Sequence, residues 1–79
     1  MKARVTVMLK GGILDPQGEA VKNALNSLGY NQVNLVRQGK IIEISLDETS
    51  KEKAKKSIEN MCEKLLANTV IESYEIEII

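Results

Sequence analysis

The chain has 79 residues, enough for one small domain over residues 1–79 with a limited hydrophobic core, so we expect it to associate with itself or with a partner. The 11 basic and 11 acidic residues balance and only 3% of residues are aromatic, so no nucleic-acid partner and no polybasic membrane contact are expected. One cysteine and no histidine exclude an internal disulfide, a Cys/His or Ser/His/Asp catalytic set and a histidine-containing metal site. No signal peptide or membrane span is indicated, and we expect a cytoplasmic protein.

The N-terminal part of the sequence predicts a strand, a glycine-rich loop and a helix. Apolar and polar side chains alternate over residues 3–9, which is typical of a half-buried strand. The loop covers residues 10–18, and its Asp15-Pro16 pair is a common helix start, because aspartate caps free amides and proline suits the first helical position. Apolar residues then recur at helical spacing over residues 20–28.

The C-terminal part predicts a hairpin, a second helix and a last strand. Residues 33–37 and 41–46 are β-rich runs joined by a short link that contains Gly39, which is typical of a hairpin. Helical spacing then extends over residues 50–67, and alternation returns over residues 70–79. The second helix is expected to begin at a capping box formed by Thr49 and Glu52.

The element order is β-α-β-β-α-β, which predicts an α+β fold of the ferredoxin-like class. In this fold a four-stranded antiparallel sheet carries two helices on one face, with the first and third strands in its centre. The expected core lies between that face and the helices: Val5, Val7, Leu9, Ile42, Ile44, Leu46, Ile76 and Ile78 under Leu25, Leu28, Ile58, Met61 and Leu65. The opposite face is expected to be mixed: Arg4, Thr6, Met8, Ile41, Glu43, Glu75, Glu77 and Ile79.

Several functions known for this fold fail on the residues present. An RNA-recognition module needs aromatic side chains on its central strands, and a metal chaperone needs paired cysteines in the first loop. The glycines of residues 10–18 also lack the spacing and the terminal Lys-Ser/Thr of a phosphate-binding loop. What remains is a module that binds a small ligand or a protein.

Two short motifs carry a more specific resemblance. Leu-Asp-Pro-Gln-Gly at residues 14–18 and Val-Arg-Gln-Gly-Lys at residues 36–40, at this separation, resemble the PurS family of small subunits of phosphoribosylformylglycinamidine (FGAM) synthase. The similarity runs from the first predicted strand to the last. The resemblance implies a non-catalytic assembly subunit in de novo purine biosynthesis, which bridges a glutaminase and an ATP-dependent synthetase and supports ammonia transfer between them.

The resemblance also implies partners and cofactors. The chain is expected to form a homodimer, with a tetramer as the other possibility, and to join an ATP- and glutamine-dependent ligase without catalysing on its own. No cofactor is expected in this subunit, whereas ATP and magnesium act in the complex. The candidate partner interface comprises Lys10, Asp15, Gln17, Gly18, Arg37, Gly39 and Lys40.

These residues also have simpler roles. Asp15 is expected to cap the first helix, Gly39 to permit the hairpin, and Arg37 and Lys40 to keep its tip in water. The lysines near the start of the second helix are expected to form a solvated face, and Cys62 a buried small side chain.

One alternative stays open. An ACT-like regulatory module has the same element order and a glycine or an Asp-x-x-Gly sequence near its first helix, which residues 15–18 partly resemble. Such a module would bind an amino acid or a similar small ligand. The Val-Arg-Gln-Gly-Lys motif fits the PurS pattern better.

Overall fold

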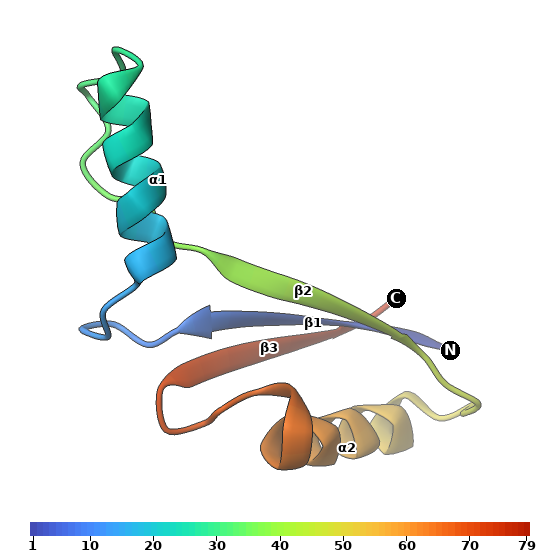
Figure 1. Cartoon of the computed structure of the whole chain (residues 1–79). Coiled ribbons are helices and arrows are strands. Elements are labelled where there is room, and N and C mark those ends of the chain that lie inside the picture. The colour runs from blue at the N-terminus through green and yellow to red at the C-terminus, as the bar shows by residue number, and fades with distance from the viewer.

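The computed structural model describes all 79 residues as an elongated molecule. Its elements are β1 (Lys2–Leu9), α1 (Pro16–Ser27), β2 (Gly39–Ser45), α2 (Lys51–Met61), the π-helical segment η1 (Cys62–Leu66) and β3 (Glu72–Ile78). The radius of gyration is 16.0 Å, whereas a compact domain of this length is expected near about 12 Å. The extra length comes from α1, which projects away from the sheet (Figure 1). None of the helices has the length and apolar character needed to cross a bilayer.

The sheet has three antiparallel strands in the order β2-β1-β3. In the centre, Val5 of β1 lies between Ile42 of β2 and Ile76 of β3. Alternation places these three side chains on the same face, as the sequence predicts. On the other face Arg4 forms ion pairs of 3.4 Å with Glu43 and 3.5 Å with Glu77, so the predicted mixed surface is confirmed there.

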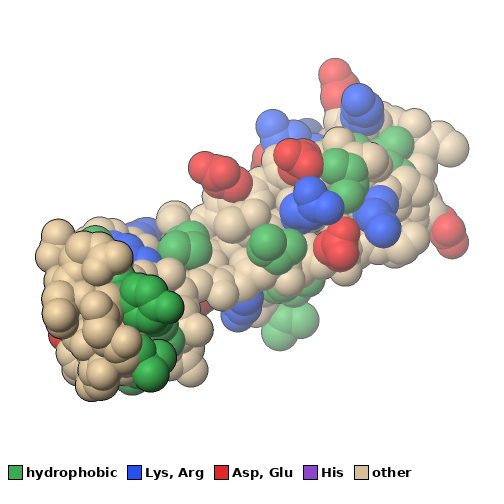
Figure 2. All heavy atoms as spheres, turned by 90° about the horizontal axis from the view of Figure 1, so that it is seen from above, with side chains coloured by type: hydrophobic (Ala, Val, Ile, Leu, Met, Phe, Trp, Pro, Cys, Tyr) green, Lys and Arg blue, Asp and Glu red, His purple; other side chains and the backbone are tan.

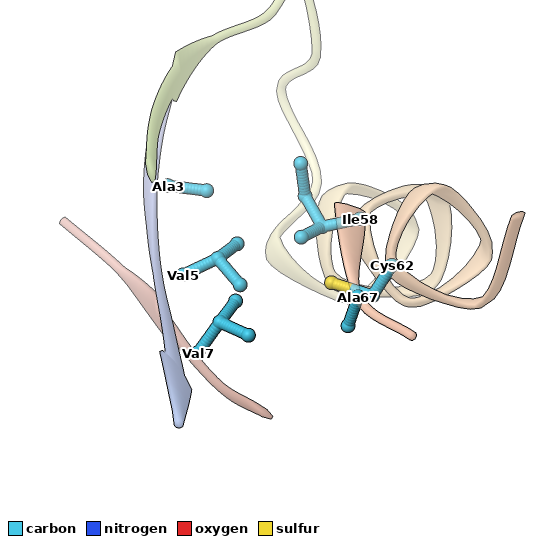
Figure 3. Close-up of a cluster of buried hydrophobic side chains, with 6 residues drawn as sticks. All are labelled: Ala3, Val5, Val7, Ile58, Cys62 and Ala67. Carbon is cyan, nitrogen blue, oxygen red and sulfur yellow. The ribbon is translucent and has the colours of Figure 1, made fainter. Parts of the chain in front are cut away.

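The hydrophobic core lies between β1 and the second helical unit, α2 with η1. Val5, Val7, Ile58 and Cys62 are fully or almost fully buried, and Figure 3 shows the two valines pointing toward the helix. Burial of each large aliphatic side chain contributes roughly 1.5–3 kcal/mol. The predicted burial of Cys62 is confirmed, whereas Leu65, which was expected in the core, is 83% exposed.

The predicted four-stranded sheet with both helices on one face is wrong. Residues 33–37 form no strand, and β2, expected in the centre, is an edge strand. The segment after α1 instead returns beside that helix (Figure 1), where the Asn26 side chain donates to the carbonyls of Tyr30, at 2.9 Å, and Val33, at 3.3 Å. Contacts with α1 therefore take the place of pairing with β2, and Leu25 and Leu28 do not cover the sheet.

The two helix starts differ from each other in how well the sequence predicts them. Asp15 is the N-cap of α1 and Pro16 its first residue, as expected. For α2 the predicted capping box is wrong, because the N-cap is Ser50, whose side chain accepts from the amide of Lys53 at 3.3 Å. The Glu48 carboxylate accepts from the amides of Thr49 and Ser50, just before the helix begins.

Candidate functional site

The seven candidate residues lie together where α1 joins the sheet. We call this place the elbow: the segment that leaves β1, residues 9–18, meets the segment that returns to β2, residues 36–40. The two motifs, separated in the sequence, make contact here where Asp15 meets Gln38 and Gly18 meets Val36, and Arg37 reaches back to the end of β1. The elbow positions α1 relative to the sheet, since α1 makes no extensive contact with the strands or with α2.

Asp15 joins the two segments through its carboxylate. One oxygen accepts from the amide of Gly18 at 2.9 Å, which caps α1, and the other accepts from the amide of Gln38 at 2.8 Å. These backbone hydrogen bonds, that of Gln38 first, hold the pKa of Asp15 below its ordinary value. A carboxylate that accepts from several amides is stabilised in its charged form. Asp15 therefore caps the helix, as the sequence predicts, and also holds the returning chain.

Gly18 is a glycine because the returning backbone passes directly over it. It is the only buried residue of α1, and a Cβ at this position would overlap the carbonyl oxygen of Val36. A second close approach lies nearby, where a Cβ on Gly39 would overlap the sulfur of Met8. Each motif thus supplies a glycine where another segment needs the space.

Arg37 and Lys10 bond to backbone carbonyls around the elbow. The Arg37 guanidinium donates to the carbonyl of Leu9 at 2.6 Å and to that of Lys10 at 3.1 Å, the last residues before the loop turns. The ammonium of Lys10 donates to the carbonyl of Thr69 at 2.8 Å. The guanidinium therefore has carbonyl partners within its own chain.

A pocket of about 290 Å³ opens beside the elbow. It is lined by Val7, Leu9, Asp15, Gln17, Gln38, Gly39, Lys40 and Glu72. Gln17 and Lys40 are exposed here, and neither side chain forms a hydrogen bond or an ion pair within the chain. Of the seven candidate residues, these two have polar groups free to meet another molecule.

No catalytic arrangement accompanies the pocket. Cys62 is buried in the core between β1 and the second helical unit and does not line the pocket. Burial, with the charges of Glu63 and Glu59, raises the pKa of its thiol. No group of three or more carboxylate or thiol side chains is placed to hold a metal ion. The elbow offers backbone groups, an amide and an ammonium, which suit recognition of another molecule.

The sequence interpretation missed the surface that α1 and the returning segment form. We call residues 16–36 the arm. Leu28 is 74% exposed and Leu35 72%, and from Asn23 to Val36 no residue carries a charge. Figure 2 shows hydrophobic side chains on the flank of the arm, whereas acidic and basic groups are interspersed over the body. The uncharged run is visible in the sequence and is the signal that would have revealed this surface.

Comparison with known proteins agrees with the motifs. The PurS family model, described as phosphoribosylformylglycinamidine (FGAM) synthase, matches residues 2–79. The PurS subunit of FGAM synthase from Methanocaldococcus jannaschii is 47% identical over 77 residues, which cover 98% of this chain and 93% of that protein. The crystal structure of Bacillus subtilis PurS superposes with a TM-score of 0.86 at 51% identity and covers 96% of this chain and 94% of that one.

A further structure shows such a chain among other subunits. In the structure of PurLQS from Thermotoga maritima, a chain 33% identical to this one matches with a TM-score of 0.86 over 96% of this chain and 93% of that one. The family resemblance found in the sequence is thereby confirmed, and it favours the assembly-subunit hypothesis over the ACT-like module. This chain belongs to the PurS family and is a subunit of FGAM synthase in purine biosynthesis.

Proposed function

We propose that this chain is a non-catalytic subunit that bridges the glutaminase and the ATP-dependent synthetase of FGAM synthase and supports the transfer of ammonia between them. The observation that carries this proposal is the arm, which extends from the folded body with exposed leucines and an uncharged tip. Such a surface suits contact with protein, because the buried centres of interfaces are depleted in charged residues. The related chain in PurLQS from Thermotoga maritima supports the same role.

The chemistry is assigned to the other subunits. In this chain the one thiol is buried and its pKa is raised, and no cluster of ligands suits a metal ion. Glutamine hydrolysis therefore belongs to the glutaminase, and ATP with its magnesium ion to the synthetase. The complex operates in the cytoplasm, as the reducing compartment expected for a lone, unpaired cysteine suggests.

Among the candidate interface residues, the elbow divides the roles. Asp15, Gly18, Arg37 and Gly39 fix the backbone, whereas Gln17 and Lys40 present free polar groups at the pocket. We assign the contact with a partner subunit to the latter two. An amide can donate and accept at once, and a lysine ammonium can pair with a carboxylate of the partner.

The proposal includes a homodimer in which two chains exchange arms. The outer edge of β2 is unpaired, and Ile42 and Ile44 beside it are only half-buried, since α2 lies over β1 and β3. The arm contains the helix and the β-rich segment that a ferredoxin-like fold places at this position. A second copy therefore carries what this sheet lacks, and its uncharged, leucine-bearing surface matches an apolar face.

Reconstitution tests the bridging role. The chain is mixed with the glutaminase and synthetase subunits of the same organism, and complex formation and glutamine-dependent turnover are measured. We expect both to require this chain, while turnover with free ammonia continues without it. Equal glutamine-dependent activity with and without the chain would refute the bridging role. In the same assay Lys40→Ala should weaken the complex, with Lys56→Ala on the outer face of α2 as a matched control.

Sedimentation equilibrium tests the homodimer. We expect the wild-type chain to be dimeric at micromolar concentration and Leu35→Ser to shift it toward monomer. Leu65→Ser is the control, because Leu65 is also largely exposed, at 83% against 72% for Leu35, but lies in η1, away from the arm. A monomeric wild-type chain would contradict the exchange of arms without affecting the bridging role.

A further inference from the structure

The elbow fixes the direction in which the arm leaves the sheet. Three independent contacts cross it: the Asp15 carboxylate with the amide of Gln38, the Arg37 guanidinium with the carbonyl of Leu9, and the Val36 carbonyl against Gly18. They join segments far apart in the sequence, since Asp15 and Gln38 are separated by 23 positions. With hydrogen bonds on both sides of the crossing, the arm does not swing freely about one peptide.

The sequence also allows a second position for the β-rich segment of residues 33–37. Residues 33–37 and 41–46 are both β-rich, and a turn at Gln38, Gly39 and Lys40 would pair them as a hairpin within one chain. That closed form would complete the four-stranded sheet without a partner. In the structure the closed form is absent, and Gly39 and Lys40 instead run straight into β2, opposite Met8 and Val7.

The contacts at the elbow distinguish the two placements. To form the hairpin, the chain would have to reverse direction at Gln38, so its amide would leave Asp15 and the guanidinium of Arg37 would leave the carbonyls at the end of β1. The hydrogen bonds therefore stabilise the extended arm and contribute nothing to the closed one. In arm exchange, the conformation of the connecting segment decides whether an element packs on its own chain or on a second copy. An interaction made in only one of two states shifts the population toward that state.

We propose that Asp15 and Arg37 are positioning residues that hold the arm extended and thereby select pairing with a second copy over closure on the chain's own sheet. This inference rests on the proposed exchange of arms. It gives the two motifs a shared role, because together they set the geometry of assembly from inside the chain. The neighbouring Gln17 and Lys40 remain available for other subunits.

The test uses the full chain with Asp15→Ala and Arg37→Ala, singly and together. We expect the dissociation constant of the dimer to rise by roughly tenfold or more for each change, the effect of one charge-assisted hydrogen bond. Arg37→Lys, which keeps one donor, should restore part of the affinity. Asp47→Asn and Lys56→Ala are matched controls, since both side chains are exposed and form no ion pair or hydrogen bond.

A second measurement separates positioning from stability. In the monomer of the double variant, amide hydrogen exchange of residues 33–36 should stay as slow as in the wild-type dimer, because these residues pair with β2 of their own chain in place of β2 of the second copy. The core around Ile58 should unfold at the wild-type temperature. If the wild-type chain is a dimer and the double variant dimerises with the same dissociation constant, the inference is overturned, but the proposed exchange of arms is not. Loss of the cooperative unfolding transition together with the dimer would also overturn it, as would a monomer in which the amides of residues 33–36 exchange rapidly. A monomeric wild-type chain would overturn both.

Discussion

The carboxylate of Asp15 accepts a hydrogen bond of 2.8 Å from the backbone amide of Gln38, and this hydrogen bond joins the two sequence motifs. The same carboxylate caps α1 through the amide of Gly18. One side chain therefore fixes both the start of the helix and the path of the chain that returns from it. Asp15 is only partly buried, so water competes for these hydrogen bonds, and the effect of losing them is measured at the residues that they hold.

The first prediction concerns pH. The pKa of Asp15 in the folded chain lies below its ordinary value of 3.8, with the Gln38 amide as the largest cause. The stabilisation from this carboxylate is therefore fully present above that value and is lost as the pH falls through the lower, folded pKa. We expect the amide proton shifts of Gln38 and Gly18 to titrate together, with a midpoint below 3.8, in a solution NMR series.

The control is Asp15→Asn, which keeps the shape of the side chain and cannot ionise. In this variant the common titration should disappear, while the resonances of β1 and β3 stay where they are. Independent midpoints for Gln38 and Gly18 in the wild-type chain would contradict a shared carboxylate.

The second prediction concerns space at the elbow. Gly18→Ala places a methyl group against the carbonyl of Val36, so the returning segment must shift. We expect the free energy of local unfolding of the arm to fall by about 1–3 kcal/mol, the usual cost of overpacking. Hydrogen exchange should show it as faster exchange in α1 with unchanged protection in β1.

The matched control for this change is Gly11→Ala in the same loop. No atom lies within 4 Å of the position that a Cβ on Gly11 would occupy, so exchange in the arm should stay at the wild-type rate. Equal effects of the two substitutions would show that backbone entropy, and not contact with Val36, explains the glycine at residue 18.

The sequence predicts those parts of the fold that depend on local pattern. Alternation places Val5 and Val7 on one face of β1, and helical spacing brings Ile58 and Cys62 over them, because each pattern needs only its own segment and one buried surface. The start of α1 is predicted for the same reason, since Asp15 and Pro16 act within one turn.

The position of residues 33–37 could not be predicted in this way. Their β propensity indicates that they suit a half-buried surface, but it does not say which surface or which chain supplies it. The answer depends on contacts over a long sequence distance, such as Arg37 with Leu9, 28 residues away. Likewise the two motifs predict where the elbow lies. Only the structure shows that Asp15 accepts from backbone amides there and that Arg37 donates to backbone carbonyls.

The third prediction compares buried and exposed aliphatic residues of the same helical unit. Ile58 is fully buried against Val5, so Ile58→Ala should lower the free energy of unfolding by about 2–5 kcal/mol in urea denaturation. Leu65 is 83% exposed, and Leu65→Ala should change it by less than about 0.5 kcal/mol. Similar losses for both variants would mean that Leu65 is covered in solution by another chain.

The last prediction concerns the reactivity of Cys62. Burial raises the pKa of its thiol above the ordinary 9.0, and the neighbouring Glu63 and Glu59 act in the same direction. Because thiolate is the reactive form, an aromatic disulfide reagent at neutral pH should modify the folded chain only as fast as the core opens. In urea, which unfolds the chain, the reaction should be fast. The protonated thiol therefore stabilises the folded chain. This stabilisation is fully present below pH 9.0, and it is lost as the pH rises through the higher pKa of the folded state. Rapid stoichiometric modification of the folded chain would place Cys62 at an accessible surface and reopen the question of chemistry within this subunit.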